Sequence, residues 1–219
     1  MNVFDILGPV MIGPSSSHTA GAVRIGRIAH ALLGHPAVKA DIALHGSFAK
    51  TYKGHGTDKA LIAGIMGMAP DDDRIRNAPQ LAAQQGLEIT LRTVELDDAH
   101  PNTAQISLTD AQNRTITVQG ASIGGGNIQI TQINSMDVLL TGQYTAIIVL
   151  HQDTPGTIAA VTQVLASCQA NICNFRLSRQ KKGGLAVMTI ELDGTVTQDL
   201  IPQLDALPNI FSSTMLKPQ

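Results

Sequence analysis

The sequence predicts an α+β protein built from two domains, and three observations lead to this prediction. A chain of 219 residues, of which 43% are hydrophobic, can fill one large core or two ordinary ones. Between residues 87 and 133, short segments alternate apolar and polar positions, as antiparallel strands do. After Thr141-Gly142-Gln143 a new order of strands and helices begins. We therefore expect an α/β-type domain with a mixed or antiparallel sheet over 1–141, and a second domain over 142–219.

The first domain is organised around the motif Gly13-Pro14-Ser15-Ser16-Ser17-His18-Thr19-Ala20-Gly21, which follows a short apolar stretch at residues 3–7. Apolar residues recur at helical spacing beyond it, from Ala22 to Leu33. The hydroxyls and the imidazole are therefore expected at a helix N-terminus. Free N–H groups and the helix dipole favour an anion there, such as a small carboxylate. In a simpler alternative, one serine caps the helix and the others are solvated.

A half-buried strand is expected at residues 38–45, and the segment after it is the second candidate for site residues. This segment, Gly46–Asp58, is polar and interrupted by glycines, so we expect a loop. It carries Lys50, Lys53 and His55 at the carboxyl end of a strand, which is where α/β sheets place their ligands. The alternative is that the lysines are solvated and the histidine is incidental.

Two later helix starts in the first domain carry capping residues. Thr57 or Asp58 is expected to cap a helix that continues to Met66. Asp71-Asp72-Asp73 precedes Arg74–Leu81, and three carboxylates in a row could bind a metal or cap a helix. Acidic residues stabilise a helix start through its dipole without any ion, so we favour capping.

The strands that follow, at residues 87–94, 103–109, 115–120 and 127–133, predict an antiparallel sheet with one polar face. Two segments interrupt this pattern. His100-Pro101-Asn102-Thr103 is expected to form a turn that presents its histidine rather than burying it. Ser122–Asn127 contains Gly124-Gly125-Gly126, which indicates either a backbone close to a ligand or a bulge alone.

The second domain shows the element order βαββαβ, which is typical of the ferredoxin-like fold. The expected strands cover residues 144–151, 171–179, 185–191 and 210–215, and the helices lie near 157–168 and 197–207. The turn Asp153-Thr154-Pro155-Gly156 and the later Ala170-Asn171-Ile172 resemble those of ACT domains. This resemblance implies a regulatory amino-acid sensor that pairs side by side with a second copy.

Composition and charge exclude several functions. The net charge is −2 and the pI is near 6.4, so the chain has no basic field for nucleic acid or an anionic membrane surface. Without a signal peptide or a membrane-length apolar run, we expect a cytoplasmic protein. Cys168 and Cys173 are too few to hold an iron–sulfur cluster or a structural zinc ion. We expect them to be small buried apolar residues.

Taken together, the motifs resemble the β subunit of bacterial iron–sulfur-dependent L-serine dehydratase over essentially the whole chain. The resemblance rests on Gly13–Gly21, Gly46–Asp58, His100–Thr103, Ser122–Gly126 and the ACT-like unit. It implies conversion of L-serine to pyruvate and ammonia, with a [4Fe–4S] cluster held by three cysteines of a partner α subunit. It also implies that the first domain resembles the substrate-binding regulatory domain of some 3-phosphoglycerate dehydrogenases. The cysteine count agrees, because this chain cannot hold such a cluster by itself.

Within this chain, the resemblance makes His18 the expected catalytic residue, since an imidazole titrates near neutral pH. Whether His18 takes the Cα proton or only orients L-serine stays open. The residues expected to bind substrate are Ser15, Ser16, Ser17, Thr19, Gly46, Ser47, Lys50, His55, Gly124 and Gly125, and no metal ligand is expected. The alternative function is a sensor protein without catalysis. A nicotinamide-linked oxidoreductase is excluded, because the glycine run lies between strands with no helix after it.

Overall fold

The structure is a computed structural model, and it describes residues 11–194, 196 and 199–218. The apolar stretch expected at residues 3–7 lies outside the described residues. The chain divides into two compact units between Asn134 and Ser135, whereas the sequence placed the domain boundary after residue 141. The first unit contains all the expected site residues of the first domain, and the second contains the ACT-like elements.

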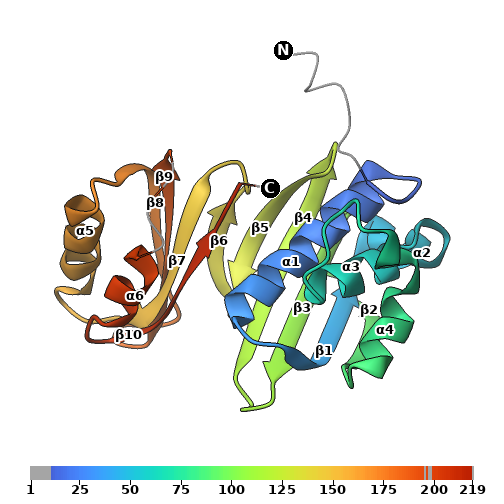
Figure 1. Ribbon diagram of the computed structural model, residues 1–219, viewed down its shortest axis with the longest axis horizontal. Helices are drawn as coiled ribbons and strands as arrows, with labels where there is room; N and C mark the ends of the chain where they lie inside the picture. Colours follow the sequence, from blue (N-terminus) through green and yellow to red (C-terminus); the bar gives the residue numbers. More distant parts are fainter. Residues whose placement is uncertain (1–10, 195, 197–198, 219) are drawn as a thin grey trace. The chain divides into compact units, whose positions relative to one another are not determined.

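The first unit is built on a mixed sheet (Figure 1). Its strands β2, β1, β3, β4 and β5 lie side by side in that order. They are β1 (Ala37–Leu44), β2 (Glu88–Thr93), β3 (Thr103–Asp110), β4 (Thr115–Gly124) and β5 (Asn127–Ile133). Neighbours from β1 through β5 run antiparallel, but β2 pairs with β1 in parallel. The expectation of antiparallel pairing is therefore wrong for β2, because helices connect β1 to β2 and allow a parallel return.

Within its described residues, this unit also contains the α-helices α1 (Gly21–Leu33), α2 (Gly46–His55), α3 (Thr57–Ile65) and α4 (Ala78–Gln84). Helix α1 packs on β3 and β4, and α3 packs on α1 (Figure 1). Gly26 and Gly64 permit this close helix pair, since a Cβ atom on Gly64 would lie 2.1 Å from the carbonyl oxygen of Val23. Helices α2 and α3 contact each other, and both contact the turn Ser16–Ala20 that precedes α1.

The segment expected to be a loop, Gly46–Asp58, is helical instead. Helix α2 starts where β1 ends, and the backbone N–H groups of Ser47 and Phe48 donate to the carbonyl oxygen of Pro101. Phe48 is fully buried and anchors a helix whose other residues are polar or half-buried. Because Phe48 is the one buried residue of α2, the segment shows no repeat of apolar residues at helical spacing, and its sequence does not reveal the helix.

The junction of α2 and α3 also corrects the predicted cap. Gly56 adopts a left-handed conformation with φ of 70°, ends α2 and stands at the N-cap of α3. Neither Thr57 nor Asp58 caps α3, because both lie inside its first turn. In contrast, Asp72 does cap the 3-10 turn Asp73–Asn77, where its Oδ1 accepts from the N–H of Arg74 at 2.9 Å. The predicted capping role of this acidic run is thus confirmed.

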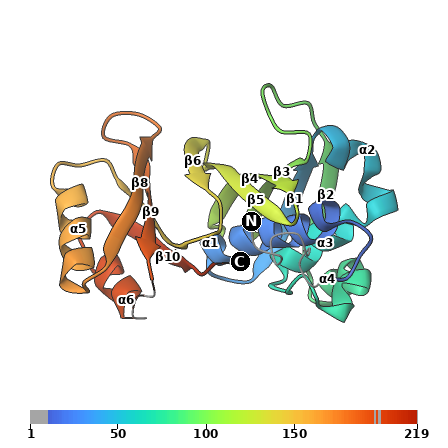
Figure 2. The same ribbon diagram turned by 90° about the horizontal axis from the view of Figure 1, so that it is seen from above.

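The second unit has the predicted ferredoxin-like fold (Figure 2). Its elements are β6 (Met136–Leu140), β7 (Thr145–Gln152), α5 (Thr157–Ser167), β8 (Asn171–Arg179), β9 (Leu185–Asp193), α6 (Leu200–Asp205) and β10 (Ile210–Leu216). Four strands form an antiparallel sheet in the order β10-β7-β9-β8, with α5 and α6 on one face. The core lies between helices and sheet and includes Val149, Val161, Leu165 and Ile190. The sequence did not predict β6.

Strand β8 is an edge strand and is largely exposed. Cys173 lies on it beside a bulge between Ile172 and Asn174, and its side chain is exposed. The expectation that both cysteines are buried is therefore wrong for Cys173, while Cys168 is half-buried. An alternating pattern does not show whether a strand lies at the centre or at the edge of its sheet.

Candidate functional site

The motif around His18 forms the start of the first long helix. Ser16–Ala20 make one π-helical turn that continues directly into α1. Ser15 is the N-cap, and its Oγ accepts from the backbone N–H of His18 at 3.3 Å. The same Oγ lies 3.3 Å from His18 Nδ1, and Ser17 Oγ lies 3.1 Å from that nitrogen. Ser15 thus both caps the helix, as the simpler alternative required, and contacts the imidazole.

The other ring nitrogen of His18 is held from a different helix. Its Nε2 lies 3.2 Å from the Oγ of Ser47 in the first turn of α2. The ring packs edge-on against Phe48 and lies 4.7 Å from the ring of His55, centroid to centroid. His18 is 9% exposed. Hydroxyls both donate and accept, so these partners allow the imidazole to carry its proton on either nitrogen.

The surroundings of His18 favour the neutral imidazole. Burial lowers the pKa of His18 below its ordinary value, and the neighbouring His55 lowers that pKa further. A neutral imidazole at pH 7 has a free electron pair and can accept a proton. The geometry and the charge state therefore suit a base or an orienting group.

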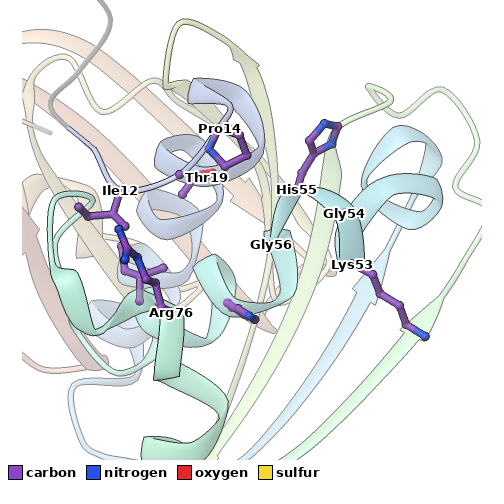
Figure 3. A pocket seen from close by; sticks show the side chains of 11 residues that line it. Ile12, Pro14, Thr19, Lys53, Gly54, His55, Gly56 and Arg76 are labelled. Carbon is purple, nitrogen blue, oxygen red and sulfur yellow. The ribbon is translucent and has the colours of Figure 1, made fainter.

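A cavity of about 290 Å³ lies beside His55 (Figure 3). It is lined by residues 12–14, Thr19, residues 53–56, Lys59 and residues 75–76. Thr19 and Pro14 lie on one side of the cavity, and the end of α2 with His55 lies on the other (Figure 3). Of the residues expected to bind substrate, the lining includes Thr19 and His55.

The other expected residues Ser16, Gly46 and Lys50 do not line this cavity. Ser16 is half-buried in the π-helical turn. Gly46 has φ of 57°, and a Cβ atom there would lie 2.6 Å from the carbonyl oxygen of Pro101. The backbone conformation and this close approach therefore require glycine at position 46, without any contact to a ligand. Lys50 is exposed on α2 and does not line the cavity. Ser16 and Gly46 are instead the chain neighbours of Ser17 and Ser47, two of the residues whose hydroxyls contact the imidazole of His18.

The glycine run does not join the cavity lining. Gly124, Gly125 and Gly126 form the tight connection between β4 and β5, all with positive φ, beside a bulge. Arg24 of α1 donates to the carbonyl oxygen of Gly126 at 2.6 Å. This geometry agrees with the bulge alternative, and substrate binding by Gly124 and Gly125 stays a prediction. His100 is exposed, as expected, and its Nδ1 accepts from the N–H of Asn102.

Two cationic residues that line the cavity were missed by sequence analysis. Lys59 lies in the first turn of α3, and Arg76 lies in the 3-10 turn after the acidic run. Figure 3 shows Arg76 directed toward Ile12, whereas Lys53 points away from the other labelled residues. No local motif distinguishes Lys59 and Arg76 from solvated surface charges, because their shared cavity depends on how the helices pack.

The chain's own residues do not fit an iron–sulfur cluster. Within residues 11–194, 196 and 199–218, no group of three or more His, Cys, Asp or Glu side chains is arranged to hold a metal ion. Both cysteines belong to the second unit. The part of the chain that the structure describes also contains no helix long and apolar enough to cross a membrane.

Comparison with known proteins identifies the family. The family model for the serine dehydratase beta chain matches residues 2–93, and a model for the AHAS small subunit-like ACT domain matches residues 147–212. A Bacillus subtilis protein named as a probable L-serine dehydratase beta chain is 46% identical over 215 residues, covering 98% of this chain and 97% of that protein. The chain belongs to the L-serine dehydratase beta-chain family.

Further relatives agree with this assignment to the L-serine dehydratase beta-chain family. The L-serine dehydratase beta chain of Peptoniphilus asaccharolyticus is 38% identical over 200 residues, covering 91% of this chain and 90% of that one. The D-3-phosphoglycerate dehydrogenase of Bacillus subtilis is 24% identical over 196 residues, covering 89% of this chain and 37% of that enzyme. The serine dehydratase family match at residues 2–93 includes His18, Ser47, His55 and Arg76, so the cluster around His18 lies within the family's own segment.

Proposed function

We propose that this chain is the β subunit of a [4Fe–4S]-dependent L-serine dehydratase and converts L-serine to pyruvate and ammonia together with an α subunit. The observation that carries the proposal is the buried imidazole of His18, with serine hydroxyls at both ring nitrogens. This arrangement lies within the segment that matches the serine dehydratase beta-chain family. A binding module alone has no need for an imidazole that is held neutral and oriented in this way.

In this proposal the start of the first helix receives the carboxylate of L-serine. Ser15, Ser16 and Ser17 supply hydroxyls, and the first N–H groups of the helical segment add donors at the positive end of its dipole. The neutral His18 then accepts the Cα proton or orients the substrate for its loss. Loss of this proton and of the hydroxyl group gives aminoacrylate, which tautomerises and is hydrolysed to pyruvate and ammonia.

The [4Fe–4S] cluster is assigned to the α subunit. The sequence contains two cysteines, and a cluster of this type needs at least three well-placed thiolates from the protein. Both cysteines lie in the second unit, away in sequence from the segment that contains His18. A partner must therefore provide the metal, and this chain provides the imidazole and the hydroxyls.

The second unit is proposed to dimerise through β8. Phe175 and Leu177 are each 36% exposed on this edge strand. They pair with Ile190 and Met188 of β9, two core residues, so their side chains lie on the face of the sheet that the helices cover. A second ACT unit placed beside β8 would extend both the sheet and this apolar face.

The decisive experiment is anaerobic co-expression of this chain with its α partner, followed by an assay of pyruvate formed from L-serine. We expect turnover with both chains and none with either alone. His18→Asn should lower kcat/KM by about 100-fold or more, which is the usual contribution of a general base. His35→Asn is the matched control, because His35 is exposed beyond the other end of α1.

Two outcomes would contradict the proposal. A loss below about threefold for His18→Asn, or about 0.65 kcal/mol, would exclude a catalytic role for this residue. A colourless homodimer that binds L-serine, and that shows no turnover with any cluster-bearing partner, would favour the sensor function instead.

A further inference from the structure

The cavity beside His55 is positively charged. Lys53, Lys59 and Arg76 line it, and none of the lining residues is Asp or Glu. Among the described residues, the ion pairs of the chain use other basic side chains, such as Arg74 with Asp72 and Arg92 with Asp41. Lys59 and Arg76 thus bring positive charge to a concave surface, and neither forms an ion pair with another described residue.

The same cavity contains buried polar atoms without partners. Thr19 is 2% exposed and lines the cavity, and its Oγ1 has no hydrogen-bond partner among the described residues. The Nδ1 of His55, which also lines the cavity, is buried and unpartnered within the same residues. A buried polar group left unpaired is destabilising, so a bound ligand that pairs with the Oγ1 of Thr19 would remove this penalty.

The start of α3 opens onto the cavity as well. Gly56, the N-cap of α3, and Lys59, in its first turn, both belong to the lining. The cap makes no side-chain hydrogen bond to the first N–H groups of α3. These groups and the helix dipole attract a negative charge, while the carboxylate of Asp58 in the same turn, which does not line the cavity, opposes that attraction.

We propose that this cavity binds a small carboxylate, with Lys59 and Arg76 as its charged contacts and Thr19 and the first turn of α3 as hydrogen-bond donors. The site neighbours the His18 cluster without coinciding with it, since His18 does not line the cavity while His55 lines it and lies against the ring of His18. An anion in the cavity therefore acts on His18 through His55. The choice of a carboxylate over other anions rests on the proposed function, because L-serine and pyruvate both carry one.

The test uses the purified full-length chain without its partner. Binding of sodium pyruvate, L-serine and sodium phosphate is measured by calorimetry at constant ionic strength with chloride as the balancing anion, and the His55 ring signals are followed by NMR. We expect pyruvate or L-serine to bind and to shift the His55 signals. Arg76→Gln and Lys59→Gln should each weaken this binding at least tenfold.

Arg74→Gln is the matched control for charge, because it removes a cation from the same 3-10 turn at a position that does not line the cavity. It should leave the dissociation constant within twofold. Equal binding by wild type and Arg76→Gln, binding of phosphate alone, or no binding at all would overturn the proposal. Turnover with the α partner is measured separately. An enzyme that is active yet binds no carboxylate in this cavity contradicts this inference alone, and carboxylate binding without turnover contradicts the proposed function alone.

Discussion

Two junctions in this chain share the same local sequence features and differ in what their polar groups contact. Each contains Pro, Gly and hydroxyl side chains and leads into a helix: Gly13–Gly21 at the start of α1, and Asp153–Thr157 at the start of α5. In the second junction, Asp153 accepts from Arg179 at 2.7 Å and from the N–H of Gly183 at 2.9 Å. The hydroxyls of Thr154 and Thr157 bond each other at 2.8 Å.

The first junction is arranged differently. In the second junction, Asp153 bonds to Arg179 and Gly183 and so holds the turn in place. In the first, the hydroxyls around His18 can exchange donor and acceptor roles, and the Oγ1 of Thr19 has no described partner. A hydroxyl-rich helix start therefore offers polar groups to a ligand only where the surrounding elements leave some of those groups unsatisfied.

The largest expected effect tests the hydroxyls at both nitrogens of His18. The double variant Ser17→Ala/Ser47→Ala removes one partner from each ring nitrogen, so it should lower kcat/KM about 10- to 100-fold by loosening the imidazole. Thr154→Ala, the matched change in the second junction, should leave kcat/KM within twofold. Equal losses in both variants would show that the two junctions do not differ in function.

The close contact of α1 and α3 that positions the first junction can be broken directly. Gly64→Ala places a methyl group against the backbone of α1, so it should lower the free energy of unfolding by about 1–3 kcal/mol. Gly54→Ala is the control, because its Cβ atom would meet open space inside α2 and should stabilise the chain by about 0.5–1 kcal/mol. Denaturant unfolding measures both, and a neutral Gly64→Ala would exclude this packing.

A smaller effect is expected where the second unit is proposed to associate. Phe175→Ser should weaken self-association about tenfold, because it removes an exposed apolar side chain from the edge strand β8. Phe211→Ser changes an exposed phenylalanine on the opposite edge strand, β10, and should have little effect. Sedimentation measures both variants. Weaker association for Phe211→Ser but not for Phe175→Ser would place the interface at β10.

The smallest expected effect is a difference in the pH range over which each junction loses its contribution to stability. Burial and His55 lower the pKa of His18 in the folded chain. On acidification the unfolded chain therefore takes up a proton at His18 at a higher pH than the folded chain does. The free energy of unfolding consequently falls as the pH drops below about 6.5. The Gly183 N–H and Arg179 lower the pKa of Asp153, so its contribution is complete above its ordinary pKa of 3.8 and is lost only at lower pH.

Unfolding curves from pH 8 to pH 3 test this order. His18→Asn should flatten the dependence just below pH 6.5, and Asp153→Asn should flatten it only in the acid range. His55→Gln should raise the pKa of His18, which an NMR titration of the His18 ring measures. An unchanged or lower pKa for His18 in that variant would show that His55 does not act on it.

Much of this architecture could be predicted from local pattern. The ACT-like unit followed from the element order and the Asp153–Gly156 turn, and the structure confirms its βαββαβ order. The helix start at Ser15–His18 followed from the apolar residues that recur at helical spacing after this motif, from Ala22 to Leu33. The Gly46–Asp58 segment could not be recognised as helical, since Phe48 alone is buried among the residues of α2.

The sequence by itself determined the family resemblance, the two-unit organisation and the presence of His18 among hydroxyls at a helix N-terminus, because these depend on residues close together in the chain. The tertiary structure alone decided that Ser47, 29 residues away, reaches His18 Nε2, and that Lys59 and Arg76 line one cavity with Thr19. These contacts depend on the packing of α1 against α3 at Gly26 and Gly64. No local pattern specifies which distant side chains such a helix pair will bring together.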